Sequence, residues 1–323
     1  MKDYLDRNLA LETVRVTEMA ALASSLHMGR GDEKAADQAA VNAMRNFLNQ
    51  LMISGKVVIG EGERDKAPML FIGEEVGKGN GPKVDIALDP LEGTTITAHG
   101  GENALSVLAM GEEGSFLHSP DIYMHKIAFG RKFQDLDINP EDNPENIVQS
   151  FAKYAEMKIE SVVVCILDRP RHQKLIDSIR SIGARIKLIP DGDVSAVIAT
   201  SVEDSGIDLY MGIGGSPEGV LAASALRCLG GKIYTKLIFD DDKIYERAQS
   251  MGITDKNTIY QTNDLAKGNV MFTATGVTDG TMLKGVRIKN ELATTHSVVM
   301  RSKTKTVRYI KAHHNLNIKK FYK

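Results

Sequence analysis

The segment VDIALDPLEGTT at residues 84–95 places two carboxylates at the end of an apolar strand. Asp89 and Glu92 stand three residues apart across a proline, so both can turn toward one cation. Gly93 lets a ligand approach the backbone closely, and Thr94 faces the point where a phosphate binds at a helix start. The pattern indicates metal-dependent chemistry on a phosphate. The alternative is an ordinary strand-to-helix turn in which a threonine caps the helix.

A second acidic loop, IGEGERD at residues 59–65, follows another apolar strand. Glu61, Glu63 and Asp65 stand at alternate positions, so two of them can lie on one side of an extended chain. The alternative is a solvated charged loop, which is the commoner fate of such runs. Repetition of the design after two separate strands favours a shared metal site. The nearby segment Gly73-Glu74-Glu75 is expected at the surface, because no second ligand-like group accompanies it.

Two further acids stand in predicted helices. Asp37 falls on the apolar stripe of a helix capped by Asp32, where an unpaired carboxylate is costly, so a metal or a base must partner it. Glu218 stands at the start of a helix opened by GIGGSPEGV, whose glycines let backbone amides approach a phosphate. The alternative is a dinucleotide-binding turn. It is disfavoured because Pro217 replaces the last glycine of that motif and no acid ends the next strand.

The elements that must hold these residues divide the chain of 323 residues into two parts. Apolar residues at helical spacing predict helices over 9–27 and 32–51, and short apolar strands follow them. Beyond a polar stretch at 133–145, strands alternate with helical patterns, as in β-α-β units with a parallel sheet. The fold class is therefore α/β. We expect a metal-binding α+β domain at 1–157 and an α/β substrate-binding domain at 158–323, with the final strands returning to the first.

Composition narrows the function to small-molecule chemistry. The formal net charge of −2 gives no field that would attract nucleic acid or an anionic membrane. No run approaches the roughly 18 apolar residues that span a bilayer, and the N-terminus lacks the design of a secretory signal. The two cysteines exclude a disulfide framework, and the histidines lack zinc-site spacing. We expect a cytoplasmic enzyme with a hard cation bound by oxygen.

Seven segments in this order carry a family resemblance: GRGDEKAAD, VVIGEGERDKAPML, DPLEGT, PDIYM, DRPRH, PDGDV and GIGGSPEGV. Together they resemble class II fructose-1,6-bisphosphatase, within the lithium-sensitive sugar and inositol phosphatase superfamily. The resemblance implies a five-layered αβαβα sandwich, Mg²⁺ or Mn²⁺, and a homo-oligomer, dimeric or tetrameric. It also implies hydrolysis of the 1-phosphate of fructose 1,6-bisphosphate in gluconeogenesis, with sedoheptulose 1,7-bisphosphate as a further substrate. One departure is Glu33, with Lys34 after it, where family members often carry a lysine.

The resemblance also implies which residues form the site. The implied metal ligands are Asp37, Glu61, Asp89, Glu92 and Glu218. The implied substrate contacts are Glu92, Gly93, Thr94, Tyr123, Arg169, Pro170, Arg171, Asp191, Gly192, Asp193 and Gly215.

Among these residues, Thr94 is expected to orient the attacking water. Asp65, which is neither a metal ligand nor a substrate contact, is expected to aid proton transfer. Arg169 and Arg171 would clamp the distal phosphate, since a guanidinium binds phosphate with two parallel hydrogen bonds. Asp191 and Asp193 would accept protons from sugar hydroxyls. The alternatives are a solvated pair of arginines and a capped turn.

Two other function classes are kept open. An NAD(P)-dependent oxidoreductase would use the GIGG loop, but it leaves the acids of the first domain unexplained. A noncatalytic sugar-phosphate sensor would need the two arginines without needing five metal ligands.

Overall fold

The computed structural model describes residues 2–62 and 69–318, which form two compact units. Unit 1 comprises residues 1–116 and 268–323, and unit 2 comprises residues 117–267. In the described part of the chain, no helix is both long and apolar enough to cross a membrane. Both units combine helices with a mixed sheet, which confirms the predicted α/β class. The five-layered sandwich stays a prediction, and each unit is described by itself.

Unit 1 is built on a sheet that has eight strands among the described residues, in the order β12, β13, β11, β4, β3, β1, β2, with β14 also paired to β13. The strands are β1 (Ser54–Ile59), β2 (Glu75–Val76), β3 (Lys83–Glu92), β4 (Leu105–Glu112), β11 (Val270–Gly276), β12 (Arg287–Lys289), β13 (Leu292–Arg301) and β14 (Thr306–Asn315). Its helices are α1 (Lys2–Ser25), α2 (Glu33–Leu48) and α3 (Thr94–His99). The two longest helices agree with the predicted pair.

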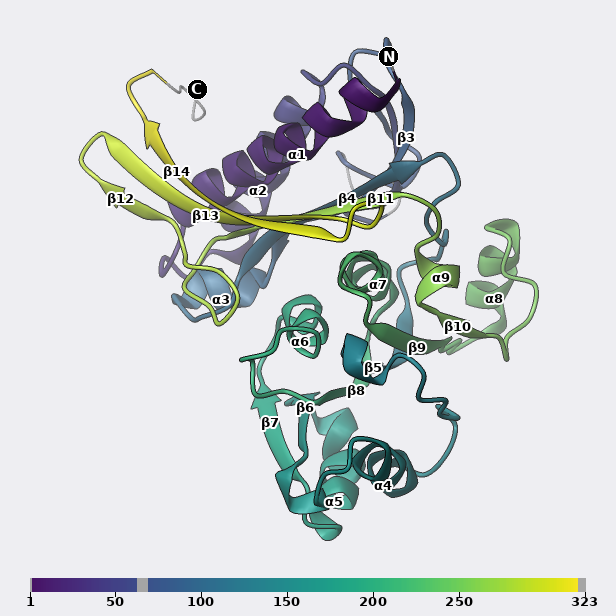
Figure 1. The fold of residues 1–323 in the computed structure, drawn as a ribbon. Helices are drawn as coiled ribbons and strands as arrows, with labels where there is room; N and C mark the ends of the chain where they lie inside the picture. Colours follow the sequence, from purple (N-terminus) through teal and green to yellow (C-terminus); the bar gives the residue numbers. More distant parts are fainter. Residues whose placement is uncertain (1, 63–68, 319–323) are drawn as a thin grey trace. The chain divides into compact units, whose positions relative to one another are not determined.

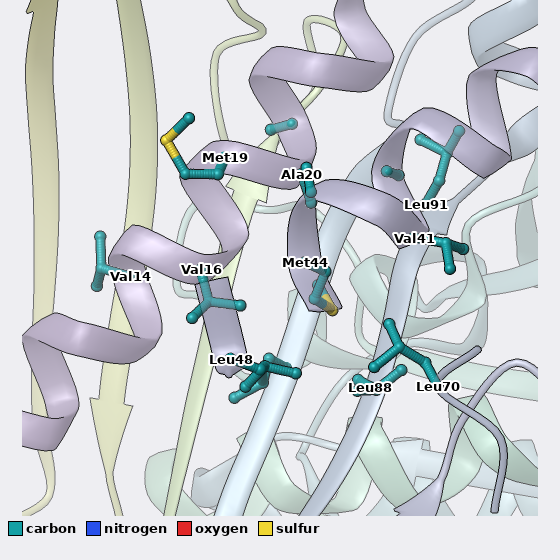
Figure 2. Close-up of a cluster of buried hydrophobic side chains, with 14 of the residues drawn as sticks. Val14, Val16, Met19, Ala20, Val41, Met44, Leu48, Leu70, Leu88 and Leu91 are labelled. Carbon is teal, nitrogen blue, oxygen red and sulfur yellow. The ribbon is translucent and has the colours of Figure 1, made fainter. Parts of the chain in front are cut away.

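The core of unit 1 lies where α1 and α2 pack against the sheet (Figures 1 and 2). Val41, Met44 and Leu48 are buried on one stripe of α2, as its apolar spacing predicts. The Asp32 carboxylate accepts a hydrogen bond from the Ala35 N–H at 3.0 Å and so caps the helix. These contacts hold α2, and therefore Asp37, against the sheet.

Buried hydroxyls fix the register of α1 against β11. The Oγ1 atoms of Thr13 and Thr273 are 2.9 Å apart, and those of Thr17 and Thr275 are 2.8 Å apart. Each pair satisfies two buried polar groups at once, so sliding the helix by one turn would break both. The segment that completes unit 1 at the C-terminal end therefore holds the N-terminal helix in place.

Glu74 is buried, so the expected surface position is wrong for this residue, whereas Gly73 and Glu75 are exposed as expected. The Glu74 carboxylate accepts a hydrogen bond from Arg45 Nε on α2 at 2.5 Å and another from the Leu70 N–H. The bond with Arg45 supplies the charge that a buried acid needs. Glu74 thus ties the loop that follows Glu61 to the helix that carries Asp37.

Unit 2 is a second sheet with the order β10, β9, β5, β8, β6, β7. Its strands are β5 (Tyr123–Phe129), β6 (Val163–Leu167), β7 (Arg185–Ile189), β8 (Leu209–Gly215), β9 (Lys232–Leu237) and β10 (Ile259–Gln261). Its α-helices are α4 (Pro144–Tyr154), α5 (Gln173–Ser181), α6 (Asp193–Ala199), α7 (Ser216–Leu229), α8 (Asp242–Ser250) and α9 (Thr262–Leu265). Single 3₁₀ turns cover Arg131–Phe133, Ile159–Ser161 and Pro170–His172. Within this unit, α4 and α5 lie on one face of the sheet, and α6 and α7 lie on the other (Figure 1).

The prediction of a parallel sheet in the second half is only partly right. β6 is parallel to β7 and β8, but β5 runs antiparallel to both β8 and β9. The expected division at residue 158 also differs from the observed unit boundary at 117, because β5 pairs inside the second sheet. The sequence predicts β14 and β13 as a terminal hairpin, and their pairing confirms it.

Replacing the Glu74 carboxylate by an amide tests the importance of its bond with Arg45. Glu74→Gln should lower the free energy of unfolding by about 1–3 kcal/mol, because a charge-assisted bond is lost in a buried place. Urea denaturation measures the change, and Glu75→Gln is the matched control because Glu75 is exposed. Equal stability of the two variants would show that the carboxylate of Glu74 is not a structural tie.

Candidate functional site

Asp89 and Glu92 lie on one continuous strand, so the expected strand end at Asp89 is not observed. The ladder between β3 and β4 shifts register between these residues, with Asp89 opposite Val107 and Glu92 opposite Leu105. A bulge adds a residue to one strand and turns its side chains. Asp89 accepts a hydrogen bond from the Leu91 N–H at 3.0 Å, while Glu92 is buried. The irregularity, rather than a corner, sets how the two carboxylates are presented.

Gly93 turns the chain from this strand into α3. Its φ of 92° lies in the left-handed region, and a Cβ atom there would come within 3.1 Å of the Ile96 side chain. Gly93 occupies the N-cap position without a side-chain cap, so a threonine does not cap this helix. Thr94 is the first helical residue and is partly exposed, whereas Thr95 is exposed. Thr94 thus follows Glu92 by two residues and is accessible to solvent.

Unit 1 also brings α2 beside α3. The N–H groups of Gly29 and Gly31 donate hydrogen bonds to the Thr97 and Ala98 carbonyls, at 2.9 and 2.8 Å. These bonds satisfy carbonyls at the end of α3 and fix the loop that leads into α2. Asp37 is half-buried in the second turn of α2, and burial raises the pKa of its carboxyl. A nearby cation would favour its charged form.

Glu61 follows β1 and is half-buried, with its N–H bonded to the Leu70 carbonyl at 3.0 Å. The loop after β1 thus returns to the chain near Glu74. Glu63 and Asp65, the other two acids of this loop, lie outside the described residues. The role of Asp65 in proton transfer stays a prediction.

The arginines of unit 2 are held by neighbouring groups. Arg171 donates two hydrogen bonds to the Ile213 carbonyl, from Nε at 3.2 Å and from a terminal nitrogen at 2.9 Å. Its guanidinium also lies over the Tyr123 ring, 4.7 Å from the centroid. Arg169 lies 4.0 Å from Asp191 on the next strand connection. The structure therefore brings together four of the predicted substrate contacts, in two pairs, and orients both guanidinium groups.

His172 fixes the loop that carries these arginines. Its ring is buried, with Nδ1 2.7 Å from the Leu167 carbonyl and Nε2 accepting a hydrogen bond from the Ile213 N–H at 2.7 Å. Burial lowers the pKa of this imidazole, and the neighbouring Arg171 and Arg169 lower it further. Since one ring nitrogen must accept a hydrogen bond, the neutral ring fits the site.

A buried ionic network lies at the other face of the unit 2 sheet. Lys126 Nζ is 2.7 Å from Asp193 Oδ2, and the Tyr210 hydroxyl donates to the same oxygen at 3.3 Å. Lys126 is 1% exposed and Asp193 is 5% exposed. Asp193 was predicted as a substrate contact, and Gly192 before it starts α6 with a left-handed φ of 84°. Lys126 was not predicted as a site residue, although a lysine between Met124 and Ala128 in an otherwise apolar strand indicates a buried charge that needs a partner.

Glu218 stands in the first turn of α7, which begins at Ser216 beside the predicted Pro217. Its carboxylate oxygen Oε2 is buried and, among the described residues, has no hydrogen-bond partner. Burial raises the pKa of Glu218 to about 7, although the positive charge of Lys126 opposes the rise. A cation or a hydrogen-bond donor beside Oε2 would offset the cost of burying this carboxylate.

The carboxylates predicted as metal ligands are therefore chemically suited to bind a divalent cation. Glu218 has a buried oxygen without a partner, Asp37 is half-buried, and hard oxygen donors suit Mg²⁺ or Mn²⁺. In the described ranges, no group of three or more His, Cys, Asp or Glu side chains is assembled to hold a metal ion. Four of the five predicted ligands belong to unit 1 and Glu218 belongs to unit 2. The ligand set stays a prediction.

Comparison with known proteins points to one family. The family model for "Bacterial fructose-1,6-bisphosphatase, glpX-encoded" matches residues 7–314. A protein of Escherichia coli (strain K12), fructose-1,6-bisphosphatase 1 class 2, is 44% identical to this chain over 330 aligned positions. The alignment covers 97% of both chains. The fructose-1,6-bisphosphatase class 2 of Shigella flexneri is similar to the same extent, with 44% identity and 97% coverage of each chain.

The His172 contacts generate a prediction about pH. Because the folded state lowers the pKa of this ring, His172 stabilises the protein above its ordinary pKa of about 6.5 and loses that contribution as the pH falls through the lowered value. His172→Gln keeps an acceptor but cannot titrate, so its thermal midpoint should fall less steeply on acidification than that of the wild type. Nitrogen NMR of the ring should show a neutral imidazole at pH 7. A charged ring there would contradict the assignment.

Proposed function

The chain belongs to the family of bacterial, glpX-encoded fructose-1,6-bisphosphatases, and on that premise we propose that it hydrolyses the 1-phosphate of fructose 1,6-bisphosphate. The products are fructose 6-phosphate and phosphate, as gluconeogenesis requires. Sedoheptulose 1,7-bisphosphate, which presents the same sugar-phosphate chemistry, is proposed as a second substrate.

The observation that carries this function is the buried, unpartnered carboxylate oxygen of Glu218. A buried acid without a partner is costly unless a ligand supplies charge. Together with Asp37, Glu61, Asp89 and Glu92, Glu218 would hold Mg²⁺ or Mn²⁺. Such a cation, when bound, activates water and neutralises charge on the transferred phosphoryl group.

The protein's own groups bind and orient the substrate. The hydroxyl of Thr94, held at the start of α3, positions the attacking water. Arg171 and Arg169, with Pro170 between them, bind the phosphate that does not react, and the Tyr123 ring keeps Arg171 in place.

The sugar is held by residues around Asp193. Asp191 and Asp193 accept hydroxyl protons, while Gly93, Gly192 and Gly215 allow the backbone to approach the ligand closely. Asp65 is proposed to aid proton transfer.

The oxidoreductase alternative is disfavoured by the glycine loop itself. A Cβ atom on Gly214 would collide with the Asp193 carboxylate, and one on Gly215 would collide with the Glu218 carboxylate. The carboxylates of Asp193 and Glu218 therefore occupy the space that a pyrophosphate would need beside these glycines. A noncatalytic sensor would not need a metal ion, so the sensor alternative does not account for the buried carboxylate of Glu218.

We also propose a cytoplasmic location and a homo-oligomer, dimeric or tetrameric. Both cysteines are free and buried, as suits a reducing compartment. Ile288, Leu292 and Tyr309 expose large apolar side chains on three paired strands of unit 1, a pattern that favours contact with another copy.

Removal of divalent metal is the direct test of this function. Phosphate release from fructose 1,6-bisphosphate should stop in excess chelator and return when Mg²⁺ or Mn²⁺ is added in excess of the chelator, because every proposed ligand is a hard oxygen. A colorimetric phosphate assay measures the rate. Full activity in a chelated, metal-free sample would defeat the proposed mechanism, and nicotinamide reduction by the protein would favour the oxidoreductase instead.

Thr94→Ala separates catalysis from binding. The hydroxyl acts only as water is brought to the phosphate, so its loss should lower kcat by about 10²-fold while KM stays nearly unchanged. Thr95→Ala is the matched control because Thr95 is exposed in the same turn of α3. Steady-state kinetics with circular dichroism as a folding check measures both variants. Wild-type kcat in Thr94→Ala would remove this role from Thr94.

A further inference from the structure

Lys126 is a fully buried cation in a strand that is otherwise apolar at its inward positions. It lies on β5 between Met124 and Ala128, both of which are 0% exposed. The adjacent helix α7 carries Gly219 at the point of contact, where a Cβ atom would collide with Met124 and lie 3.4 Å from Lys126 Cε. The absence of a side chain at Gly219 thus leaves room for the lysine stem to reach the start of α6.

The ammonium group is directed at one oxygen of one carboxylate. Asp193 Oδ2 accepts hydrogen bonds from Lys126 at 2.7 Å and from the Tyr210 hydroxyl at 3.3 Å. Gly214 leaves space for this contact, because a Cβ atom there would lie 3.0 Å from Lys126 Nζ and collide with Asp193. Since both bonds end on Oδ2, the Oδ1 oxygen is the acceptor that remains for a group outside the network.

Stability alone does not account for this arrangement. Burying an ammonium and a carboxylate costs solvation that their attraction recovers only in part, and apolar replacements of such pairs are often equally stable. What an ion pair supplies instead is a fixed orientation, since a lone carboxylate can rotate about its χ2 bond.

We propose that Lys126 is a positioning residue for substrate binding. It holds the Asp193 carboxylate so that the Oδ1 oxygen can accept a hydrogen bond from a hydroxyl group of the sugar. The assignment rests on the proposed function, which makes Asp193 a substrate contact. Lys126 acts through Asp193 and does not touch the substrate. Its removal should therefore weaken sugar binding more than it slows the chemical step.

The test is a double-mutant cycle with Lys126→Met, Asp193→Asn and the double variant. Each single variant should raise KM for fructose 1,6-bisphosphate by about tenfold or more, as expected for losing a charge-assisted hydrogen bond. The double variant should be no worse than the worse single variant, because Lys126 acts only through Asp193. Lys174→Met, an exposed lysine in the same unit, is the control and should leave KM unchanged.

Three readouts keep positioning distinct from folding. Thermal midpoints should fall for Lys126→Met, which leaves a buried charge alone, and recover in the double variant, in which both charges are gone. KM should not recover with them. Kinetics in which kcat falls and KM stays constant, or a stable Lys126→Met with wild-type KM, would overturn the proposal. If Lys126→Met does not fold, a double variant with a KM much above that of Asp193→Asn would overturn it, and an equal KM would support it.

Calorimetric titration with fructose 6-phosphate separates this inference from the proposed function. Wild-type protein that binds fructose 6-phosphate without hydrolysing fructose 1,6-bisphosphate would defeat the function alone, and the binding constants of the variants would then replace KM. Wild-type protein that neither binds nor hydrolyses these sugars would overturn both.

Discussion

The placement of carboxylates out of water is the constraint on which this structure depends. An acid removed from solvent must receive charge or hydrogen bonds from somewhere, or it destabilises the fold. Glu74 receives them from Arg45 and the Leu70 N–H, and Asp193 from Lys126 and Tyr210. Glu218 has a buried oxygen for which the described chain provides no donor. The first two acids are thus completed by the protein, while the third is completed by a ligand cation in the proposed function.

The backbone meets this constraint where strands give way to helices. Gly93 and Gly192 both take a left-handed conformation, each directly before the first residue of a short helix. This geometry places Glu92 and Thr94 on two sides of one turn, and Asp193 at the start of α6. Hydrogen bonds from the loop before α2 to the end of α3 then hold Asp37 near the same segment. Within unit 1, local backbone conformation and a few long-range hydrogen bonds thus set the positions of Glu92, Thr94 and Asp37.

Residues in short local motifs could be predicted from sequence, and residues placed by distant contacts could not. DPLEGT correctly predicts that a helix follows the acidic turn, because the glycine and the helix start are adjacent in the chain. Glu74 resembles a surface acid in sequence, since its partner Arg45 is 29 residues away. Lys126 meets Asp193 across 67 residues, and the antiparallel direction of β5 depends on pairing with strands much later in the chain. Local pattern carries no information about such pairings.

The chain order of the two units adds a final constraint on how the site is assembled. Unit 2 is one continuous segment, so its sheet can form from residues 117–267 alone. Unit 1 is interrupted, and its N-terminal helix α1 meets its hydroxyl partners only when β11 has been made. The strand β4 likewise pairs with β11, which follows it after more than 150 residues of intervening chain. Because contacts of such sequence separation are slow to form, we expect the sheet of unit 1 to be completed after that of unit 2. In the proposed site, Glu218 and the two arginines would then be in place before the four acids of unit 1.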